Sequence, residues 1–318
     1  MTSCVAKKVG EISPTFSFNG MVIQPTFRLQ RLSKEMLVEE VSNWTASQEY
    51  NYYMGFGGAG DALLLVACCW DDPAARVLFF NSSPMCKQLF ELFDLETLIH
   101  PNIFFSPLSH QIYDIVVNRK TFKPSAHLPD GMNVSDWTNW RKYKDRMVTS
   151  VPWAQLLGKY QNPFPTKGIV VVCPSGAFRE AARQRFISDY EYTKLVKKLL
   201  SQNYTVVTAD SPEHMRLYSN VDHPHSMRCT TTYLQFNDGH KEELNLASFL
   251  QVVNAAEFCI SVETWLVPYC GLVGLSVQCI QTRYFGTYKY GHVSPDYIFV
   301  NPEMWPTLQL VTAEEVCY

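Results

Sequence analysis

Three absences narrow what the sequence can encode. No apolar run reaches the roughly 18 residues that a membrane-spanning helix needs, and residues 1–8 carry charges without the apolar segment of a targeting signal behind them. The ten cysteines include no C-x-x-C pair, and most of them lie in apolar runs. Buried free thiols in a reducing compartment are therefore expected, instead of a disulfide framework or a metal site. These absences predict a soluble protein of the cytoplasm.

Charge is also sparse. Charged residues make up 18% of the 318 residues, hydrophobic residues make up 47%, and the formal net charge is -3. This composition excludes a disordered chain and an indiscriminate binder of polyanions, although it leaves room for a local basic face. A chain of this length has enough apolar residues for two packed domains of about 150 residues each.

Strand and helix patterns alternate along most of the chain. Asn19-Gly20 between two apolar triplets predicts a hairpin in an N-terminal extension, and later patterns predict a helix at 62–70 and a strand at 76–80. A second alternating unit starts at residue 168, after a Pro-containing linker at 161–165. We therefore predict an α/β fold of two Rossmann-like domains that face each other across a cleft, with a ligand at the carboxyl ends of the strands. The predicted divisions are 1–160, 161–290 and a tail at 291–318 that packs back across the cleft.

A glycine-rich turn at 55–60 carries the most chemical information. An aromatic strand runs into four glycines there, and Asp61 then opens an apolar helix. The turn matches the G-x-G-x-x-G fingerprint of dinucleotide sites, but the next strand is followed by Asn81 instead of the acidic residue that would hold a ribose. A nicotinamide-dependent oxidoreductase is therefore the second interpretation. Asp61 itself fits two roles, a helix cap and a base in proton transfer.

Two further polar turns follow apolar strands in the second half. Ser175 and Gly176 end the first of these strands, and three arginines follow within ten residues. Arginine forks and helix N–H groups suit a pyrophosphate, although charged side chains also occur on solvated faces. Glu263 and Thr264 end a later strand. A glutamate can hold two ribose hydroxyls and a threonine can bind phosphate, while capping of the next helix is the structural alternative for Thr264.

In this order, the three motifs resemble those of the heptosyltransferase-like (family 9) glycosyltransferases, which have the GT-B fold. The family's Gly-Asp pair before an apolar helix resembles 60–64, and its strand, small-residue turn and basic or aromatic segment resemble 170–186. Its leucine-rich helix resembles 244–250, and its next strand and polar turn resemble 255–264. The resemblance extends over residues 50 to 290. The chain departs from the family pattern where the family has Asp, Gly and His, because these positions hold Glu263, Trp265 and Pro268.

The resemblance implies an inverting glycosyltransferase that uses a nucleotide-diphosphate sugar. It makes Asp61 the base that deprotonates the acceptor hydroxyl, and it implies no metal or other cofactor. No D-x-D occurs on a predicted strand, and Asp71-Asp72 fits a turn after a helix. The residues predicted to bind the donor are Gly57, Gly58, Gly60, Ser175, Gly176, Arg179, Arg183, Arg185, Glu263 and Thr264.

An aromatic and basic segment at 119–146 is the predicted acceptor-binding face. Its seven Lys and Arg residues and three Asp residues suit an anionic acceptor. Two acceptors fit: a phosphorylated glycan or lipopolysaccharide core, and a hydroxymethylated DNA base of a bacteriophage. The second would place the protein in the host cytoplasm. A solvated loop is the structural alternative, and a non-catalytic sugar-nucleotide-binding protein is the third class of function. The residues predicted to contact the acceptor are Trp137, Trp140, Arg141, Lys142 and Lys144.

Overall fold

The computed structural model describes residues 16–18, 21–23, 34–47, 49–56, 58–80, 84–100, 153–176, 185–211, 214–282 and 302–316. The predicted acceptor-binding segment, with all five of its named residues, lies outside the described residues. Gly57, Arg179 and Arg183 also lie outside them.

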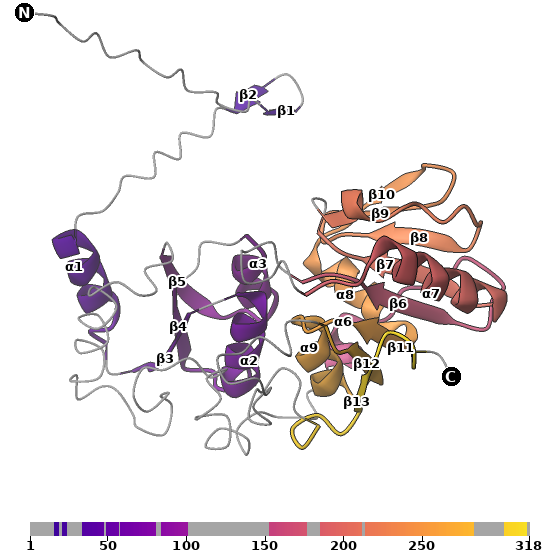
Figure 1. The fold of residues 1–318 in the computed structure, drawn as a ribbon. Helices are drawn as coiled ribbons and strands as arrows, with labels where there is room; N and C mark the ends of the chain where they lie inside the picture. Colours follow the sequence, from indigo (N-terminus) through magenta and orange to yellow (C-terminus); the bar gives the residue numbers. More distant parts are fainter. Residues whose placement is uncertain are drawn as a thin grey trace, which may run out of the picture.

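The N-terminal half begins with a hairpin and continues with a parallel sheet (Figure 1). Strands β1 (Phe16–Phe18) and β2 (Met21–Ile23) pair antiparallel on either side of Asn19-Gly20, which confirms the predicted hairpin. After α1 (Lys34–Trp44), three parallel strands pair in the order β3-β4-β5. The elements of this sheet and its helices are β3 (Asn51–Phe56), α2 (Ala59–Cys69), β4 (Ala75–Phe80), α3 (Pro84–Leu92) and β5 (Glu96–His100).

The C-terminal half contains one eight-stranded sheet with the order β10-β9-β8-β7-β6-β11-β12-β13. The six strands from β8 to β13 in this order are parallel, and their sequence order across the sheet is the 3-2-1-4-5-6 order of the Rossmann fold. The structure thus confirms an α/β fold with two Rossmann-like units. The elements of this half are α6 (Trp153–Leu157), β6 (Ile169–Cys173), α7 (Asp189–Ser201), β7 (Thr205–Ala209), η2 (His214–Leu217), β8 (Ser226–Cys229), β9 (Tyr233–Gln235), β10 (Lys241–Glu243), α8 (Leu246–Asn254), β11 (Ala256–Ser261), α9 (Leu266–Val273), β12 (Val277–Ile280) and β13 (Leu308–Val311).

The local sequence explains why β6 and α7, the first strand and the next helix of the C-terminal sheet, form where they do. Every residue of β6 is buried, as is typical of a central parallel strand with helices on both faces. A capping box starts α7: the Ser188 N–H donates to the Glu191 carboxylate at 2.8 Å, and the Glu191 N–H donates to Ser188 Oγ at 3.2 Å. Tyr192 and Val196 of α7 are then buried one helical turn apart. Capping and periodicity therefore agree on where this helix begins and which face it buries.

An apolar core joins the two halves. Residues 62–67 of α2 are completely buried, because this helix contacts β3 and α3 on its own side and α9 of the C-terminal half. Figure 1 shows α2 and α3 between the three-stranded sheet and the C-terminal half. Trp153 is also completely buried, and its ring centroid lies 4.5 Å from that of Phe93 and 6.2 Å from that of Tyr269. One hydrophobic cluster therefore includes residues of both halves.

The last described segment, 302–316, packs on the C-terminal half. Its strand β13 pairs in parallel with β12 at the edge of the sheet. Trp305 is completely buried, and its ring lies so close to Gly271 of α9 that a side chain at position 271 would clash with it. The predicted domain divisions and the predicted packing of the tail across the cleft stay predictions.

The thiols of the described residues are free, as the spacing of the cysteines predicts. All eight cysteines in the described ranges are unbridged, and seven of them are buried. Burial raises the pKa of the Cys173, Cys270 and Cys279 thiols, which disfavours the reactive thiolate. Within the same ranges, no helix combines the length and apolarity that a bilayer crossing requires.

Candidate functional site

The strand order of the C-terminal sheet reverses between β6 and β11. In Rossmann-like sheets, ligands bind outside the carboxyl ends of the two strands at such a reversal. Ser175 and Gly176 follow β6 directly, and Glu263 and Thr264 follow β11. Cys173 and Ser261, near the ends of these two strands, are register partners. The structure therefore brings together two of the polar turns that the sequence assigns to the donor.

Arg185 lies across this reversal point. Its carbonyl accepts a hydrogen bond from the Gly176 N–H at 2.8 Å, and its guanidinium Nη1 donates to the Glu263 carbonyl oxygen at 3.5 Å. A Cβ atom added to Gly176 would lie 3.1 Å from the Arg185 Cβ, so the glycine permits this close approach. The arrangement places a cation beside the turns that follow β6 and β11.

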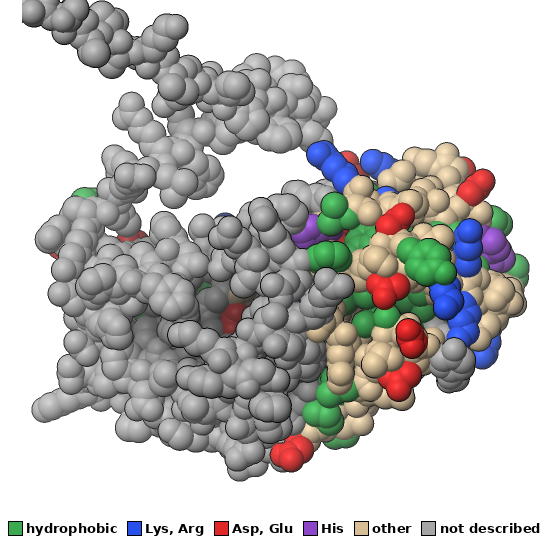
Figure 2. All heavy atoms as spheres, in the orientation of Figure 1, with side chains coloured by type: hydrophobic (Ala, Val, Ile, Leu, Met, Phe, Trp, Pro, Cys, Tyr) green, Lys and Arg blue, Asp and Glu red, His purple; other side chains and the backbone are tan. Residues whose placement is uncertain are grey.

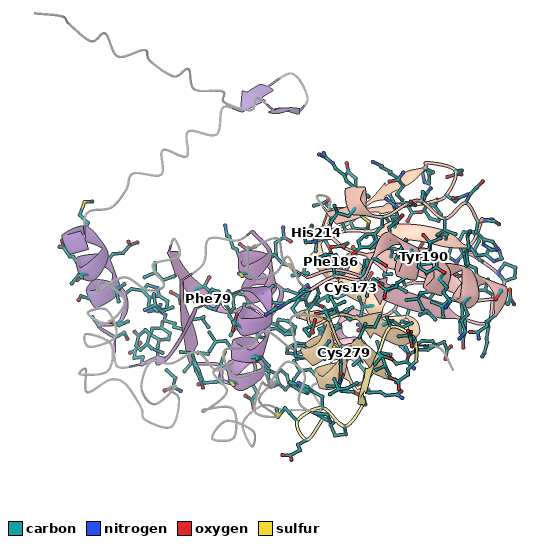
Figure 3. All side chains as sticks on the ribbon, in the orientation of Figure 1. Phe79, Cys173, Phe186, Tyr190, His214 and Cys279 are labelled. Atoms are coloured by element: carbon teal, nitrogen blue, oxygen red, sulfur yellow. The ribbon has the colours of Figure 1, made fainter. Side chains whose placement is uncertain are left out.

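Ser175, Asp210 and His214 form a buried polar cluster that the sequence did not predict. The Ser175 hydroxyl donates to Asp210 Oδ2 at 2.5 Å and lies 2.7 Å from His214 Nδ1. His214 Nδ1 lies 3.0 Å from Asp210 Oδ1, and the Ser211 N–H donates to the same oxygen at 2.7 Å. No side chain of the three is more than 5% exposed. In Figure 3, His214 and Cys173 lie at the end of the C-terminal sheet nearer to the N-terminal half.

The geometry of this cluster differs from that of a hydrolytic triad. In a hydrolytic Ser-His-Asp triad, the serine and the aspartate contact opposite ring nitrogens of the histidine. Here Ser175 and Asp210 both contact Nδ1 of His214, and the serine proton is directed to the aspartate. A carboxylate offers about four acceptor positions. Asp210 accepts from Ser175 at Oδ2 and from Ser211 at Oδ1, and only 3% of its side chain is exposed.

A weak sequence signal for this cluster exists. Asp210 directly follows the buried strand β7, which is the second strand of the Rossmann unit, and an acidic residue at that position commonly holds a ribose. No comparable signal marks His214, because its contact with Ser175 joins residues 39 positions apart.

Glu263 is a buried residue whose carboxylate contacts Thr282, which lies just after the end of β12. Thr282 Oγ1 lies 2.9 Å from both carboxylate oxygens, and the Thr282 N–H donates to Oε1 at 3.2 Å. Burial raises the pKa of Glu263 against the opposing effects of these hydrogen bonds. Thr264 Oγ1 accepts a hydrogen bond from the Leu266 N–H at 3.2 Å and lies 2.9 Å from the Ser261 hydroxyl, whereas the N-cap residue of α9 is Trp265.

The raised pKa of Glu263 predicts a pH-dependent contribution to stability. Between the ordinary glutamate value of about 4.3 and the raised folded value, the folded state binds more protons than the unfolded state. Stability should therefore fall in this window as the pH rises, and the contribution of Glu263 should be most favourable below it. Glutamine does not titrate, so Glu263→Gln should lack the pH-dependent contribution of Glu263 to the free energy of unfolding. As the pH rises from about 4, the free energy of unfolding of the wild type should therefore fall relative to that of the variant. Urea denaturation of both proteins from pH 4 to 7 measures it, and a constant difference would contradict the raised pKa.

Asp61 makes the capping contact that the sequence offers as its structural role. Its Oδ2 accepts a hydrogen bond from the Gly58 N–H at 2.6 Å at the start of α2, and Gly60 beside it is buried. Asp61 is itself half-buried, so its carboxylate is not simply a solvated surface group. Because α2 packs on α9, Asp61 belongs to a helix that contacts the helix following Glu263 and Thr264.

Charged side chains on the visible described surface of the C-terminal half are distributed over several places. Figure 2 shows its acidic and basic side chains in separate small groups, with no broad basic area among the described residues of the visible face. Within the described ranges, no group of three or more His, Cys, Asp or Glu side chains is placed to hold a metal ion. The predicted acceptor-binding segment at 119–146 stays a prediction, because it lies outside the described residues.

Comparison with known proteins gives two distant likenesses. No protein-family model matches the chain. Human chromodomain-helicase-DNA-binding protein 9 is 26% identical over 145 residues, and the match covers 39% of this chain and only 5% of the length of that protein. The solved structure of Escherichia coli ADP-heptose LPS heptosyltransferase II is similar with a TM-score of 0.45 and 11% identity, over 82% of this chain and 90% of the other. Neither likeness assigns an activity to this chain.

Proposed function

We propose that the protein is a glycosyltransferase that moves a sugar from a nucleotide-diphosphate sugar to an acceptor hydroxyl. The observation that carries the proposal is the set of buried polar side chains at the carboxyl ends of β6, β7 and β11, in a sheet with the Rossmann strand order. Such sheets bind nucleotides at this position. The order of the motifs resembles that of the family 9 glycosyltransferases. This resemblance favours a nucleotide-diphosphate sugar, the sugar donor of such enzymes, as the bound nucleotide.

Asp210 is the residue best placed for the ribose of the donor. It directly follows the second strand of the Rossmann unit, the position at which an acidic residue commonly holds a ribose. Glu263, the residue assigned to the ribose from the sequence, follows β11 instead, and both of its carboxylate oxygens contact Thr282. Arg185 and the N–H groups of the turn after β6 would bind the diphosphate, with Arg179 and Arg183 as further candidates.

The proposed transfer is a single displacement with inversion and without a metal ion. The acceptor oxygen attacks the anomeric carbon of the sugar while its proton passes to the Asp61 carboxylate. The bond between the anomeric carbon and the diphosphate oxygen breaks, and both bonding electrons leave with the nucleoside diphosphate. Arginines neutralise the charge that develops on this leaving group. The acceptor is a phosphorylated glycan or a hydroxymethylated DNA base, and the reaction takes place in the cytoplasm.

Nucleotide binding tests the proposal most directly. We expect UDP, ADP or GDP, or one of the corresponding sugar nucleotides, to bind the wild type, as measured by isothermal titration calorimetry. Asp210→Asn should weaken this binding about tenfold to a hundredfold, because a hydrogen bond to a charged group contributes about 1.5 to 3 kcal/mol.

Asp238→Asn provides the matched control. Asp238 is exposed in the turn between β9 and β10, so the same change of charge there should leave nucleotide affinity unchanged. Equal affinities for the wild type and Asp210→Asn would remove Asp210 from the donor site. Failure of every nucleotide to bind would contradict the proposed function itself.

A further inference from the structure

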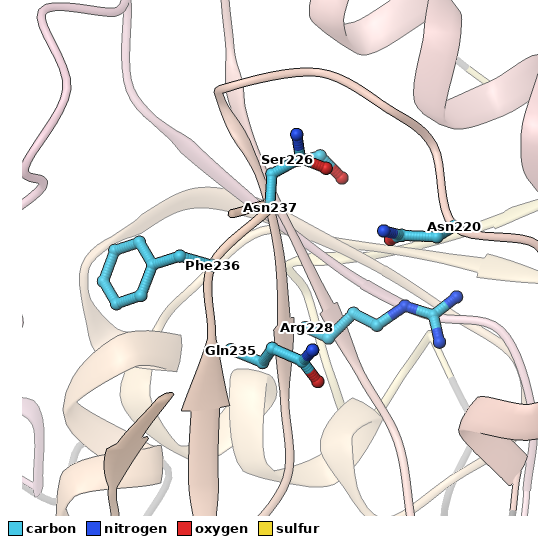
Figure 4. A pocket seen from close by; sticks show the side chains of 6 residues that line it. All are labelled: Asn220, Ser226, Arg228, Gln235, Phe236 and Asn237. Atoms are coloured by element: carbon cyan, nitrogen blue, oxygen red, sulfur yellow. The ribbon is translucent and has the colours of Figure 1, made fainter. Parts of the chain in front are cut away.

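A polar cavity of about 200 Å³ lies beside β8 and β9, on a part of the C-terminal half that the proposed transfer does not use. Ser226 and Arg228 lie on the same face of β8, and Gln235 of β9 is the register partner of Arg228. Figure 4 shows the Arg228 side chain extending between those of Asn220 and Gln235. The residues that line the cavity are Asn220, Ser226, Arg228, Gln235, Phe236 and Asn237.

The hydrogen-bond partners of the Arg228 guanidinium are neutral carbonyl groups. Its Nη1 donates to the Met215 carbonyl at 2.9 Å and its Nη2 to the Tyr218 carbonyl at 2.6 Å. Among the described residues, no carboxylate forms an ion pair with this guanidinium. Its Nε is buried without a hydrogen-bond partner there. A partly buried guanidinium that no carboxylate contacts directly retains donor capacity, so this arrangement suits an anionic ligand.

The neighbouring carboxylates have their own partners. The Asp189 carboxylate accepts hydrogen bonds from the Ser219 N–H at 2.6 Å and the Ser219 hydroxyl at 2.7 Å. These hydrogen bonds lower the pKa of Asp189, and the charge of Arg228 lowers it further without a direct ion pair. Asp222 accepts a hydrogen bond from the Asn237 amide at 3.0 Å. The cavity lining itself contains one positive side chain, four neutral polar side chains and one aromatic residue, and it contains no carboxylate.

We propose that this cavity is a binding site for a small oxyanion, the phosphate or carboxylate group of a small molecule. The guanidinium supplies the charge, while the Ser226 hydroxyl and the side-chain amides supply further hydrogen-bond donors. The volume supports a group of this size, because pockets for drug-sized ligands measure about 300 to 1,000 Å³. The site is separate from the carboxyl ends of β6 and β11, and it does not depend on the proposed sugar transfer.

The experiment measures thermal stability with increasing inorganic phosphate or acetate, at constant ionic strength set with chloride. Binding to the folded protein raises the melting temperature in a saturable way. Gln235→Glu should weaken this binding at least tenfold, because the new carboxylate lies opposite Arg228 and repels an anion. Gln309→Glu is the matched control: it makes the same change at an exposed position on β13, at the other side of the same sheet, and should respond like the wild type.

A second variant separates this cavity from the candidate nucleotide site. Ser175→Ala should keep the wild-type response to both anions. A response to phosphate or acetate that only Gln235→Glu loses supports the proposal, and the anion that responds identifies the preferred group. The proposal is overturned if neither anion stabilises the wild type, if Gln235→Glu responds normally, or if Ser175→Ala is the variant that loses the response.

Discussion

Asp61→Asn should lower turnover by about 10² to 10⁴ while nucleotide binding stays normal, the effect expected when a general base is lost. The asparagine oxygen can still accept the hydrogen bond from the Gly58 N–H that caps α2. The substitution therefore removes the basic carboxylate and retains the cap. Turnover is measured with the sugar nucleotide that binds best and with two acceptors, a lipopolysaccharide core and hydroxymethylated DNA.

Two further variants separate catalysis from capping. Asp61→Ala removes the cap as well, and should lower the free energy of unfolding by about 1 kcal/mol. Asp71→Asn changes an exposed carboxylate beyond the other end of α2, and should alter neither turnover nor stability. If Asp61→Asn turns over at a near-normal rate with an acceptor that the wild type uses, Asp61 is a cap alone and the proposed base lies elsewhere.

Trp153→Ala should lower the free energy of unfolding by about 3 to 5 kcal/mol, the usual cost of truncating a buried tryptophan. Trp153 is completely buried, and its ring lies beside Phe93 of the N-terminal half and Tyr269 of α9. Urea denaturation followed by circular dichroism measures the loss. Removal of the indole would leave a cavity where the two halves meet. We therefore expect the urea unfolding transition of the whole protein, and not only that of one half, to shift to lower urea concentration.

The same short helix supplies the control for this prediction. Leu156 lies in α6 with 63% of its surface exposed, so Leu156→Ala should change stability by less than about 0.5 kcal/mol. Trp153→Phe should cost less than Trp153→Ala, because it keeps an aromatic ring and removes an indole N–H that is buried without a partner among the described residues. A loss below about 1 kcal/mol for Trp153→Ala would contradict a core shared by the two halves.

The sequence predicted elements whose signals are local. The Asn-Gly turn predicted the hairpin of β1 and β2, and the continuous apolar run of β6 predicted a buried parallel strand. The polar turns after β6 and β11 were predicted to meet because parallel strands present their carboxyl ends at one edge of a sheet. Each of these inferences needs only the residues of one element and its immediate flanks.

Contacts between residues far apart in the sequence cannot be predicted from such local patterns. β10 is a short, fully exposed strand with the charged sequence Lys-Glu-Glu, which lacks the apolar alternation that marks a strand. Asp210 is followed by a serine and a proline, a combination typical of a turn. Its burial beside Ser175 and His214 arises only when β6 and β7 pair, so local patterns did not reveal the cluster.

The position of β13 has a consequence for how the protein folds as it is synthesised. β12 ends at Ile280, whereas its neighbour β13 begins at Leu308. During translation, at about 5 to 20 residues per second, β12 therefore leaves the ribosome before its partner exists. Until β13 pairs with it, β12 presents an open edge whose Val277, Cys279 and Ile280 are buried in the finished protein. We expect the nascent chain to be most prone to aggregation in this interval, and the pairing of β13 to be what ends it.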